Sequence, residues 1–449
     1  MREAAIDIVH RLRAAGFEAY LVGGCVRDAL LGREPHDWDV ATAATPDAAA
    51  PLFEAVQEVG RQFGVLRVQS GDAWIEVATF RTEGPYGDGR HPDAVRYATA
   101  REDAERRDFT VNALFLDPDS GKILDFVGGL SDLESRLVRA VGDPQARFAE
   151  DALRLLRAVR FACRLDFAIE PATWSAVCRE AARLRTTSAE RVRDEFLAIL
   201  TGAAPRRGLE LLLEAGLLQE FAPEVAALRG VGQGVRHHPE GDVWEHTLRM
   251  FAHATRPSPT LALGILLHDV GKPAVRTETD GEVRFHGHVE AGLEIASRVL
   301  ERLRVPNRVS EGVLALVGQH MRFLDAGRMK RSTLRRFLLQ EHFDDLLELH
   351  RLDALGSRGD LASYELCRAE RAAVERDPPQ VRPLLSGHDL MALGYAPGPR
   401  LGEILTRLVD AQLEGEVGDR ETARAWVERH YPAPPAGGAA AGEDGTPRA

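Results

Sequence analysis

Three acidic residues near the N-terminus have the spacing of a metal site. Asp37 and Asp39 are two positions apart in a segment that reads as a strand, Asp37–Thr42, so both side chains point to one face. Glu76 lies in a later strand segment, Trp74–Phe80. Adjacent carboxylates repel unless a cation lies between them, and Mg²⁺ prefers carboxylate and phosphate oxygens. The three could hold two magnesium ions, one activating an attacking hydroxyl and one neutralising a leaving pyrophosphate.

A glycine turn precedes these carboxylates. Gly23 and Gly24 follow a strand signal at Glu18–Val22 and open a short helix that runs through Leu31. Glycine lets the backbone approach a phosphate closely, and a helix N-terminus favours an anion. Arg27 lies one turn into this helix. The glycine pair alone would indicate only a tight turn before an amphipathic helix, but together with the Asp-x-Asp strand it predicts a phosphate and metal site.

The elements that position these residues predict an α+β domain over residues 1–140. Besides the strands already named, the sequence indicates a helix at Glu3–Ala15 and strands at Leu66–Gln69 and Phe109–Leu116. From Arg147 onward strand signals fade and helical periodicity dominates. The expected helices there include Arg147–Leu165, Ala189–Leu200 and Gly208–Phe221.

The composition is that of a globular protein, with 44% hydrophobic and 28% charged residues. No apolar stretch has the length of a membrane span, and the N-terminus lacks the pattern of a secretory signal. The four cysteines form no CxxC pair, which is typical of reduced packing residues and predicts a cytoplasmic protein. The net charge of −12 disfavours nucleic-acid binding unless basic residues gather on one face.

The pattern GG-x-VRD-x-LLG-x(4)-D-x-D, from Gly23 to Asp39, resembles the signature of class II tRNA nucleotidyltransferases and bacterial poly(A) polymerases of the polymerase-β-like superfamily. Three more segments match that family in the same order: its second motif at Arg106–Leu114, its hinge at Asp125–Arg139 and its nucleotide-recognition helix at Glu150–Phe161. The resemblance implies a polymerase-β-like nucleotidyltransferase head followed by an all-α neck, an HD-type helical domain and a helical tail.

The resemblance also implies roles for individual residues. Asp37 and Asp39 would bind catalytic Mg²⁺, with Glu76 as third carboxylate. Residues that would bind the nucleotide are Gly24 and Arg27 at its phosphates, Arg107 and Asp108 at its triphosphate or ribose, Asp151 and Arg154 at its base edge, and Arg157 and Arg160 in support.

Asp151 and Arg154 are expected to be i,i+3 neighbours on a helix, where they present an acceptor and a forked donor together. Such a pair matches the hydrogen-bonding edges of cytosine and adenine and mismatches guanine and uracil. An exposed intrahelical salt bridge is the alternative interpretation of the same spacing.

The implied activity is template-independent addition of C, C and A to the 3′ end of tRNA from CTP and ATP. The family's loop that influences the last step is present, at Gly84–Tyr97, which favours full CCA addition. Addition of CC only, of A only, or of a poly(A) tail remains an alternative. So does a non-catalytic RNA-binding factor, or an HD phosphohydrolase whose head only binds nucleotide.

A second set of residues resembles the H…HD…D pattern of HD metal-dependent phosphohydrolases. It consists of His246, the adjacent pair His268 and Asp269, and Asp353, with further histidines nearby. Mixed imidazole and carboxylate ligands suit a divalent transition metal such as Mn or Ni, or Mg with fewer histidines. Hydrolysis of phosphate esters or cyclic phosphates is one interpretation, and a helical scaffold that retains its histidines without turnover is the other.

The expected partners are the tRNA 3′ end and its acceptor and elbow region, CTP and ATP, with no membrane; the oligomeric state stays open.

These patterns divide the chain into segments of different expected roles. The segments are a head (1–140), a helical neck that recognises nucleotide and RNA (141–228), an HD-type domain (229–360), a helical tRNA-binding tail (361–431) and a disordered end (432–449).

Overall fold

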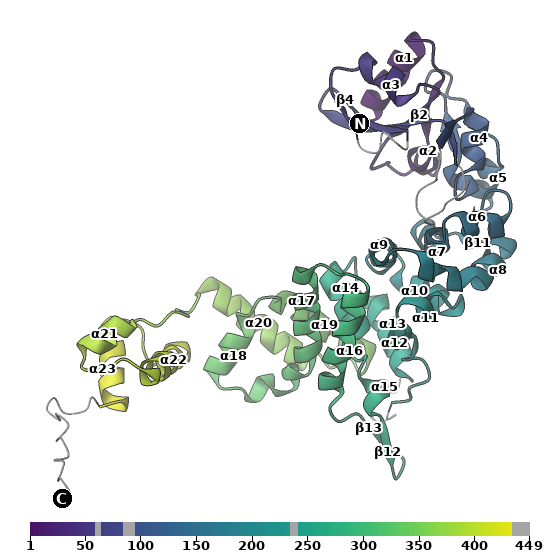
Figure 1. Ribbon diagram of the computed structural model, residues 1–449. Coiled ribbons are helices and arrows are strands. Elements are labelled where there is room, and N and C mark those ends of the chain that lie inside the picture. The colour runs from purple at the N-terminus through teal and green to yellow at the C-terminus, as the bar shows by residue number, and fades with distance from the viewer. Residues whose placement is uncertain (59–63, 84–94, 234–240, 433–449) are drawn as a thin grey trace, which may run out of the picture. The chain divides into compact units, whose positions relative to one another are not determined.

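The computed structural model describes residues 1–58, 64–83, 95–233 and 241–432 (Figure 1). These fall into two compact units, Met1–Val317 and Gly318–Ala449. The division lies inside the segment predicted as the HD-type domain. Most of the loop Gly84–Tyr97, the histidines His237 and His238, and all but the first residue of the C-terminal segment predicted to be disordered lie outside the described residues.

Within the described part of the head, seven strands form one sheet in the order β3-β4-β5-β2-β1-β8-β9. The pairing of β2 with β5 is parallel and the other pairings are antiparallel. The strands are β1 (Ala19–Val22), β2 (Asp39–Thr42), β3 (Val56–Gln57), β4 (Val65–Ser70), β5 (Ala73–Thr79), β8 (Leu114–Leu116) and β9 (Ile123–Asp125).

Helix α1 (Arg2–Ala14) packs its apolar stripe, including Ile8 and Leu12, on this sheet and forms one core with Leu21 and Val40. The other elements of the head are short. They are α2 (Gly24–Leu30), α3 (Pro46–Ala49), η1 (Ala50–Leu52), α4 (Ala100–Glu105), η3 (Thr110–Asn112), α5 (Gly129–Glu134), and a small sheet of β6 (Arg81–Glu83) with β7 (Val95–Tyr97).

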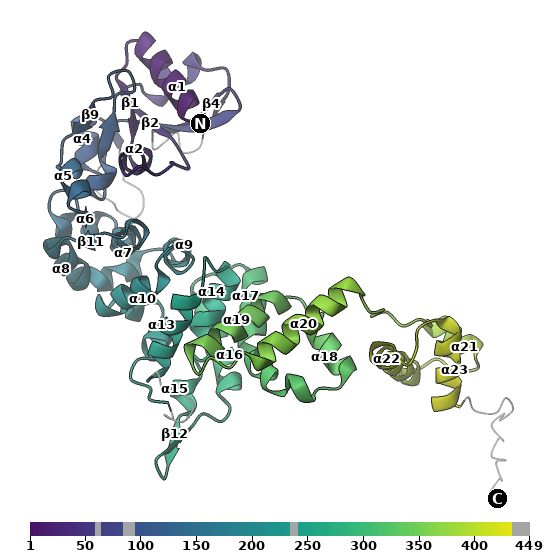
Figure 2. The same ribbon diagram turned by 180° about the vertical axis from the view of Figure 1, so that it is seen from behind.

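The neck is helical, as the sequence predicts, and α9 coincides with the expected bounds (Figure 2). The amphipathic helix α7 buries Leu155, Leu156 and Val159 and packs on α9 and α10. The elements here are β10 (Leu137–Val138), α6 (Pro144–Glu150), α7 (Leu153–Leu165), β11 (Ala168–Ile169), α8 (Pro171–Glu180), η4 (Ala181–Thr186), α9 (Ala189–Leu200), α10 (Pro205–Glu214), α11 (Leu217–Phe221) and α12 (Pro223–Ala226).

Three expected elements differ from the structure. Phe109–Leu116 is no continuous strand, because Asp108 accepts hydrogen bonds from Asn112 and from the Phe109 amide and folds the chain into η3 before β8. The helix expected over Arg147–Leu165 breaks at Asp151, which has an extended backbone and caps α7 by accepting from the Leu153 amide. Gly216, with φ of 74°, likewise separates α10 from α11.

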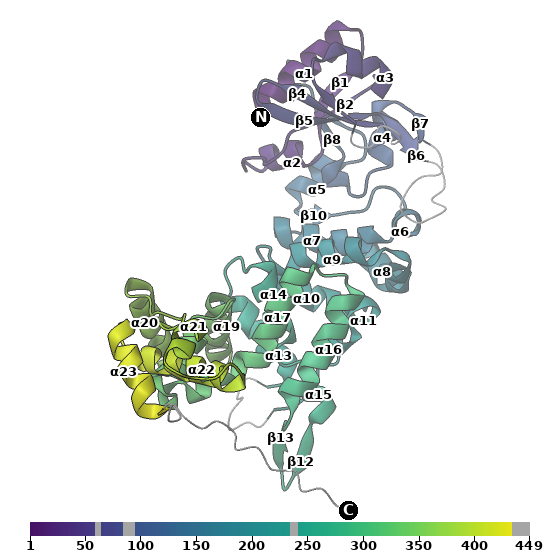
Figure 3. The ribbon, with the colours of Figure 1, turned by 60° about the vertical axis from the view of Figure 1, so that its left-hand side comes forward.

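The first unit continues through a bundle of helices and one small hairpin (Figure 3). The helix α14 is apolar and buried from Leu261 to Leu267, which is what a central helix of a bundle requires. The elements are α13 (Val243–His253), α14 (Pro259–Leu267), α15 (Lys272–Val275), the hairpin β12 (Thr277–Thr279) with β13 (Glu282–Arg284), α16 (His288–Arg302) and α17 (Asn307–Gln319).

Helices joined by loops make up the described residues of the second unit, which contain no strand. An aromatic cluster of Phe323, Phe337 and Phe343 forms part of its core, and Leu390, Ile404 and Leu408 belong to a separate cluster near the C-terminus. Its elements are η5 (His320–Arg328), α18 (Arg331–Leu338), α19 (Phe343–Gly356), α20 (Ala362–Arg376), α21 (Gly387–Ala392), α22 (Pro399–Glu414) and α23 (Arg420–His430).

Among the described helices of both units, none combines the length and apolar character that crossing a bilayer requires.

The segment Asp125–Arg139 holds the last helix of the head tightly. The Asp125 carboxylate accepts hydrogen bonds from four successive amides, Val127 to Leu130, and so caps α5. At Gly129 the chain passes so close to η3 that a Cβ would lie 2.3 Å from the Thr110 carbonyl oxygen. Only glycine fits at this position.

We therefore expect Gly129→Ala to lower the free energy of unfolding by about 1–3 kcal/mol, because backbone atoms of η3 must move to admit the methyl group. Thermal unfolding measured by circular dichroism checks this. Gly232→Ala is the control, since a Cβ there meets nothing within 4 Å. Equal midpoints for the two variants would show that η3 and α5 are not held rigidly together.

Candidate functional site

The sheet brings the three predicted carboxylates together on neighbouring strands. Asp39 is the first residue of β2, and Asp37 lies just before it. Because Val40 is paired with Val77 of β5 in parallel register, Asp39 lies beside Glu76. Asp37 and Glu76 are exposed and Asp39 is half-buried. The strand is two residues shorter than expected, but the three carboxylates are gathered as the sequence predicts.

The electrostatics of this cluster are unfavourable without a cation. Burial is the largest cause that raises the pKa of Asp39, and repulsion from Glu76 and Asp37 adds to it, so the pKa reaches about 6. The Arg107 guanidinium opposes this shift. A divalent cation bound among the three oxygen donors would remove the repulsion, and the donor set is the one that Mg²⁺ prefers. The residues present therefore fit magnesium.

The glycine turn leads from β1 into α2, as predicted. Gly23 has φ of 82° and donates its amide to the Leu114 carbonyl of β8. A Cβ at Gly23 would lie 3.2 Å from Nη1 of Arg107. The turn and Arg107 thus lie against each other, and Gly24 begins the helix.

Arg27 is more enclosed than the phosphate contact predicted for it suggests. Its side chain is almost fully buried, donates to Asp28 and to Asn112, and lies over the Phe161 ring of α7. Three of its five N–H donors are used by these partners. The structure therefore gives Arg27 a role in joining α2 to η3 and α7, and leaves only its other donors for a ligand.

Arg107 and Asp108, both in the predicted second motif, belong to two different ion-pair systems. Arg107 pairs with the buried Asp103 of α4 and donates to the Asn112 carbonyl. Asp108 accepts from Arg157 of α7 through two hydrogen bonds, at 2.8 and 2.6 Å. Burial alone would raise the pKa of Asp108, but Arg157 and the Asn112 amide outweigh it and hold the pKa at about 2. Asp108 is therefore a permanent anion that ties head to neck.

Asp151 and Arg154 are not i,i+3 neighbours within one helix, as was expected, and the alternative of an intrahelical salt bridge between them is wrong. Asp151 lies between α6 and α7, and its carboxylate binds Arg191 of α9 at 3.2 and 2.8 Å. Arg154, which is 7% exposed, instead donates to Glu150 and to the Arg147 and Arg106 carbonyls. The break between the two helices, which the periodicity hides, changes both partners.

Arg157 and Arg160, the supporting arginines, both contact Glu195 of α9. Sequence reasoning missed Arg191 and Glu195, because a charged pair four residues apart on an amphipathic helix reads as a solvated face. It also missed Asp103, although the i,i+3 and i,i+4 spacing to Arg106 and Arg107 gives a signal for that pairing.

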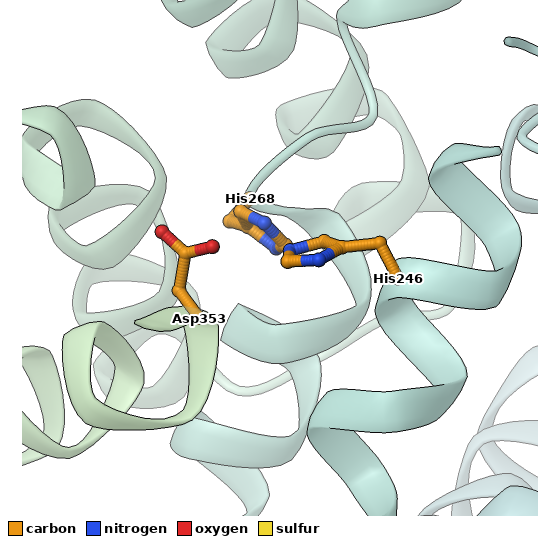
Figure 4. A group of neighbouring side chains, drawn as sticks. All are labelled: His246, His268 and Asp353. Carbon is orange, nitrogen blue, oxygen red and sulfur yellow. The ribbon is translucent and has the colours of Figure 1, made fainter. Parts of the chain in front are cut away.

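Two of the predicted HD residues face each other within the first unit. His246 of α13 and His268 at the end of α14 are buried, with ring centroids 5.6 Å apart (Figure 4). Nδ1 of His268 lies 2.9 Å from the Ile265 carbonyl, which can only accept. Nδ1 therefore carries the proton, and Nε2, which lies 3.2 Å from Oδ2 of Asp269, is the nitrogen that would bind a metal, as is usual in metal-binding histidines.

Asp269, the other residue of the HD pair, is engaged by charged neighbours. Its carboxylate lies 2.7 Å from Nζ of the buried Lys272 and 3.8 Å from Nε2 of His288. Lys272 also donates to Gln233 at 2.6 Å. Lys272 and Gln233 were missed from the sequence, where only the adjacent histidine and aspartate attract attention.

Asp353, the fourth predicted HD residue and the third side chain drawn in Figure 4, belongs to α19 of the second unit. It is half-buried and lies one turn after His350, whose ring stacks on Phe323 with centroids 4.2 Å apart. Burial lowers the pKa of His350.

A mixed sheet with three clustered carboxylates, a glycine turn and an arginine-rich helical neck defines a nucleotidyltransferase of the polymerase-β-like class. Comparison with known proteins supports this class. The model of the poly A polymerase head domain matches residues 19–139, that of the "Probable RNA and SrmB-binding site of polymerase A" matches 166–228, and that of the HD domain matches 243–349.

Similar proteins extend over nearly the whole chain. A CCA-adding enzyme of Levilactobacillus brevis is 34% identical over 94% of this chain and 96% of its own length. An A-adding tRNA nucleotidyltransferase of Deinococcus radiodurans is 38% identical, over 92% and 95%. A CC-adding tRNA nucleotidyltransferase of Thermus thermophilus is also 38% identical, over 91% and 93%.

Among solved structures, the CCA-adding enzyme of Bacillus stearothermophilus in complex with CTP matches with a TM-score of 0.73 and 27% identity. The match covers 95% of this chain and 96% of the other. The chain therefore belongs to the class II tRNA nucleotidyltransferase family, which includes the CCA-adding enzymes, and it is a nucleotidyltransferase with an HD domain.

The raised pKa of Asp39 predicts how the metal-free protein responds to pH. A carboxyl group that binds its proton more tightly in the folded state destabilises that state once it ionises, so Asp39 costs stability as pH rises from about 4 to about 6. We expect Asp39→Asn to unfold at a higher temperature than wild type in EDTA at about pH 7.5, and to lose most of this advantage at about pH 4.5.

Thermal unfolding at the two pH values measures this, and Asp72→Asn, which removes an exposed carboxylate from the β4–β5 turn, controls for the change in net charge. An advantage of Asp39→Asn that is the same at both pH values would show that the pKa of Asp39 is not raised in the folded protein.

Proposed function

We propose that this chain builds the complete CCA end of tRNA, adding C, C and A in turn from CTP and ATP without a nucleic-acid template. The observation that carries the proposal is the meeting of Asp37, Asp39 and Glu76 across β2 and β5, in a chain whose family transfers nucleotides to tRNA. Over nearly the whole chain, an A-adding and a CC-adding relative are each 38% identical and a CCA-adding relative is 34% identical, so the extent of addition is what experiment must decide.

In the proposed reaction the tRNA 3′ hydroxyl attacks the α-phosphate of the bound nucleotide and pyrophosphate leaves. Asp37 and Asp39 hold magnesium, with Glu76 completing the donor set. Bound magnesium supplies activation of the hydroxyl and neutralisation of the leaving group. The Arg107 guanidinium, which lies against the Gly23 turn, adds a positive charge on the side from which a triphosphate would enter.

The neck supplies nucleotide selection in this proposal. Asp151 accepts from the amino group that cytosine and adenine share and that uracil and guanine replace with a carbonyl oxygen. Arg154 serves as the second base-edge group through donors that its carbonyl partners leave free, and Gly24 and Arg27 act at the phosphates. Asp108, Arg157 and Arg160 hold the head and the neck in the geometry that the nucleotide requires.

We propose that each segment of the chain has its own role. The segments are a head (1–140), a neck (141–228), an HD-type domain (229–360) and a tail (361–431). The head would act on the 3′ end, and the tail would bind the elbow of the tRNA. A cytoplasmic location follows from that substrate.

The direct test uses tRNA transcripts that end at the discriminator base, after C and after CC, incubated with magnesium and labelled CTP, ATP or both. We expect stepwise growth to CCA, resolved at single-nucleotide length. Asp37→Ala should lower kcat by roughly 10²–10³-fold, because losing a magnesium ligand costs several kcal/mol of transition-state stabilisation.

Products that stop after CC, or growth only of the transcript ending in CC, would replace full CCA addition by a split pathway. If no nucleotide is incorporated on any transcript, the activity of the chain would instead be assigned to the site at His246 and His268. Asp72→Ala, which alters an exposed turn on the same sheet, should act like wild type and controls for general damage to the head.

A second activity is proposed for the HD residues, because His246 and His268 are buried, face each other and have the tautomer of His268 fixed. His246, His268, Asp269 and Asp353 would bind a divalent transition metal and hydrolyse phosphate esters or cyclic phosphates. To bind the metal, the Asp269 carboxylate would have to give up its ion pair with Lys272.

We expect His268→Gln to bind at least ten-fold less Mn²⁺ or Ni²⁺ than wild type in metal analysis, with CTP incorporation unchanged. Loss of a metal ligand lowers metal affinity at least as much as loss of a residue that only hydrogen-bonds to the ligand. His253→Gln, exposed at the end of α13, is the matched control. Hydrolysis of 2′,3′-cyclic AMP by wild type but not by His268→Gln would establish the activity. Equal metal content in both proteins would remove His268 from the site.

A further inference from the structure

One face of α9 contacts the groups assigned to nucleotide selection, although no α9 residue was expected there. Arg191 and Glu195 are four residues apart and so lie on the same side of the helix. Arg191 binds Asp151, and Glu195 binds Arg157 and Arg160. The side chains of Asp151, Glu195 and Arg160 are less than one-fifth exposed, so these ion pairs are largely removed from water.

The contact with Asp151 fixes the orientation of its carboxylate. Nη1 and Nη2 of Arg191 donate to Oδ1 and Oδ2, at 3.2 and 2.8 Å, and Oδ1 also accepts from the Leu153 amide at 3.0 Å. A planar guanidinium that engages both oxygens sets the plane of the carboxylate as well as its position. Asp151 has no helical backbone to hold it, because it lies between α6 and α7. Its direction therefore depends on Arg191.

Glu195 belongs to a series of ion pairs that extends from the neck to the head. Asp108 binds Arg157, Arg157 lies 3.6 Å from Glu195, and Glu195 binds Arg160. Arg157 and Arg160 also both lie over the Phe161 ring. Without the anion between them the two guanidinium groups would repel each other and lose their common orientation.

We infer that α9 sets the nucleotide selectivity of this enzyme: Arg191 is a positioning residue for Asp151, and Glu195 is a positioning residue for Arg157 and Arg160. The inference rests on the proposed roles of Asp151 and the two arginines in binding CTP and ATP. Arg191 determines which base Asp151 accepts. If the Asp151 carboxylate were rotated, it would no longer discriminate between a base that presents an amino group and one that presents a carbonyl oxygen. Glu195 fixes how tightly either nucleotide binds.

The test compares Arg191→Lys and Arg191→Gln with Arg193→Lys, a matched change on the same helix at a residue that contacts none of these groups. The quantity measured is kcat/KM for CTP divided by kcat/KM for UTP, on a tRNA transcript ending at the discriminator base. This ratio does not change when part of the enzyme is unfolded, so a purely structural effect would leave it alone.

We expect both Arg191 variants to lose at least roughly ten-fold in the ratio, which is the value of one charge-assisted hydrogen bond. Arg193→Lys should keep the wild-type ratio. Lysine cannot engage both carboxylate oxygens in one plane, so Arg191→Lys should restore little. A wild-type ratio in both Arg191 variants, with Asp151→Asn impaired, would overturn the inference while the role of Asp151 stands.

Glu195→Gln is compared with Asp194→Asn, an exposed neighbour that carries the same change of charge. We expect Glu195→Gln to raise KM for CTP and for ATP by roughly ten-fold each without changing the CTP to UTP ratio. An unchanged KM would exclude the role of Glu195.

If Asp151→Asn itself keeps full discrimination while wild type incorporates C and A, then Asp151 does not read the base. In that case the assignment on which the inference rests fails, and the inference on Arg191 fails with it. Absence of incorporation by wild type would be the separate failure of the proposed function.

Discussion

The mutual repulsion of Asp37, Asp39 and Glu76 is the constraint around which the head is organised. Parallel pairing of β2 with β5 places Asp39 beside Glu76. Burial, with added repulsion from Glu76 and Asp37, raises the pKa of Asp39 to about 6. A sheet that served stability alone would separate such charges, because a buried carboxylate without a counter-ion is costly. A bound cation would offset the electrostatic free energy that this cluster of carboxylates costs the fold. The Arg107 guanidinium beside the Gly23 turn offsets the repulsion in part and leaves the carboxylates available.

The neck is tied to the head by arginines rather than by an apolar interface alone. Arg154 donates to the Arg106 carbonyl, Arg147 donates to the Glu105 carbonyl, and Arg157 binds Asp108. The first two cap the end of α4, where the helix dipole favours a cation. Charged contacts of this kind are directional, so they fix the orientation of the neck helices against the head.

The HD histidines show how a buried polar pair can be prepared for a ligand by its surroundings. His268 is held in one tautomer by the Ile265 carbonyl, and Nδ1 of His288 lies close to the Phe285 carbonyl in the same manner. In both rings Nδ1 therefore carries the proton, and Nε2 faces the Asp269 carboxylate, at 3.2 Å in His268 and 3.8 Å in His288. Asp269 is balanced by the buried Lys272. The arrangement is compatible with metal binding and gives a reason for polar groups inside an otherwise apolar bundle.

The sequence by itself determined strands β1, β2, β4 and β5 of the head, the carboxylate cluster, the glycine turn and the His-Asp pattern that predicts a second metal site. Each of these is encoded within a few residues, as period-two strands, a Gly-Gly pair or an adjacent His-Asp. Helix α9 was also placed correctly by periodicity alone. What it failed to locate was the break at Asp151, because apolar periodicity continues across a capping residue that has left the helix.

Only the tertiary structure decided which charges face one another. Asp151 was expected on the same helix as Arg154, three residues away, but it lies outside that helix and binds Arg191, forty residues further along the chain. Glu195 meets Arg157 and Arg160 for the same reason, since the packing of α9 on α7 brings the two helices together. Ion pairs act through space and fall off with distance, whereas a sequence gives only separation along the chain. The chemistry of the site was therefore local in the sequence, and its positioning was not.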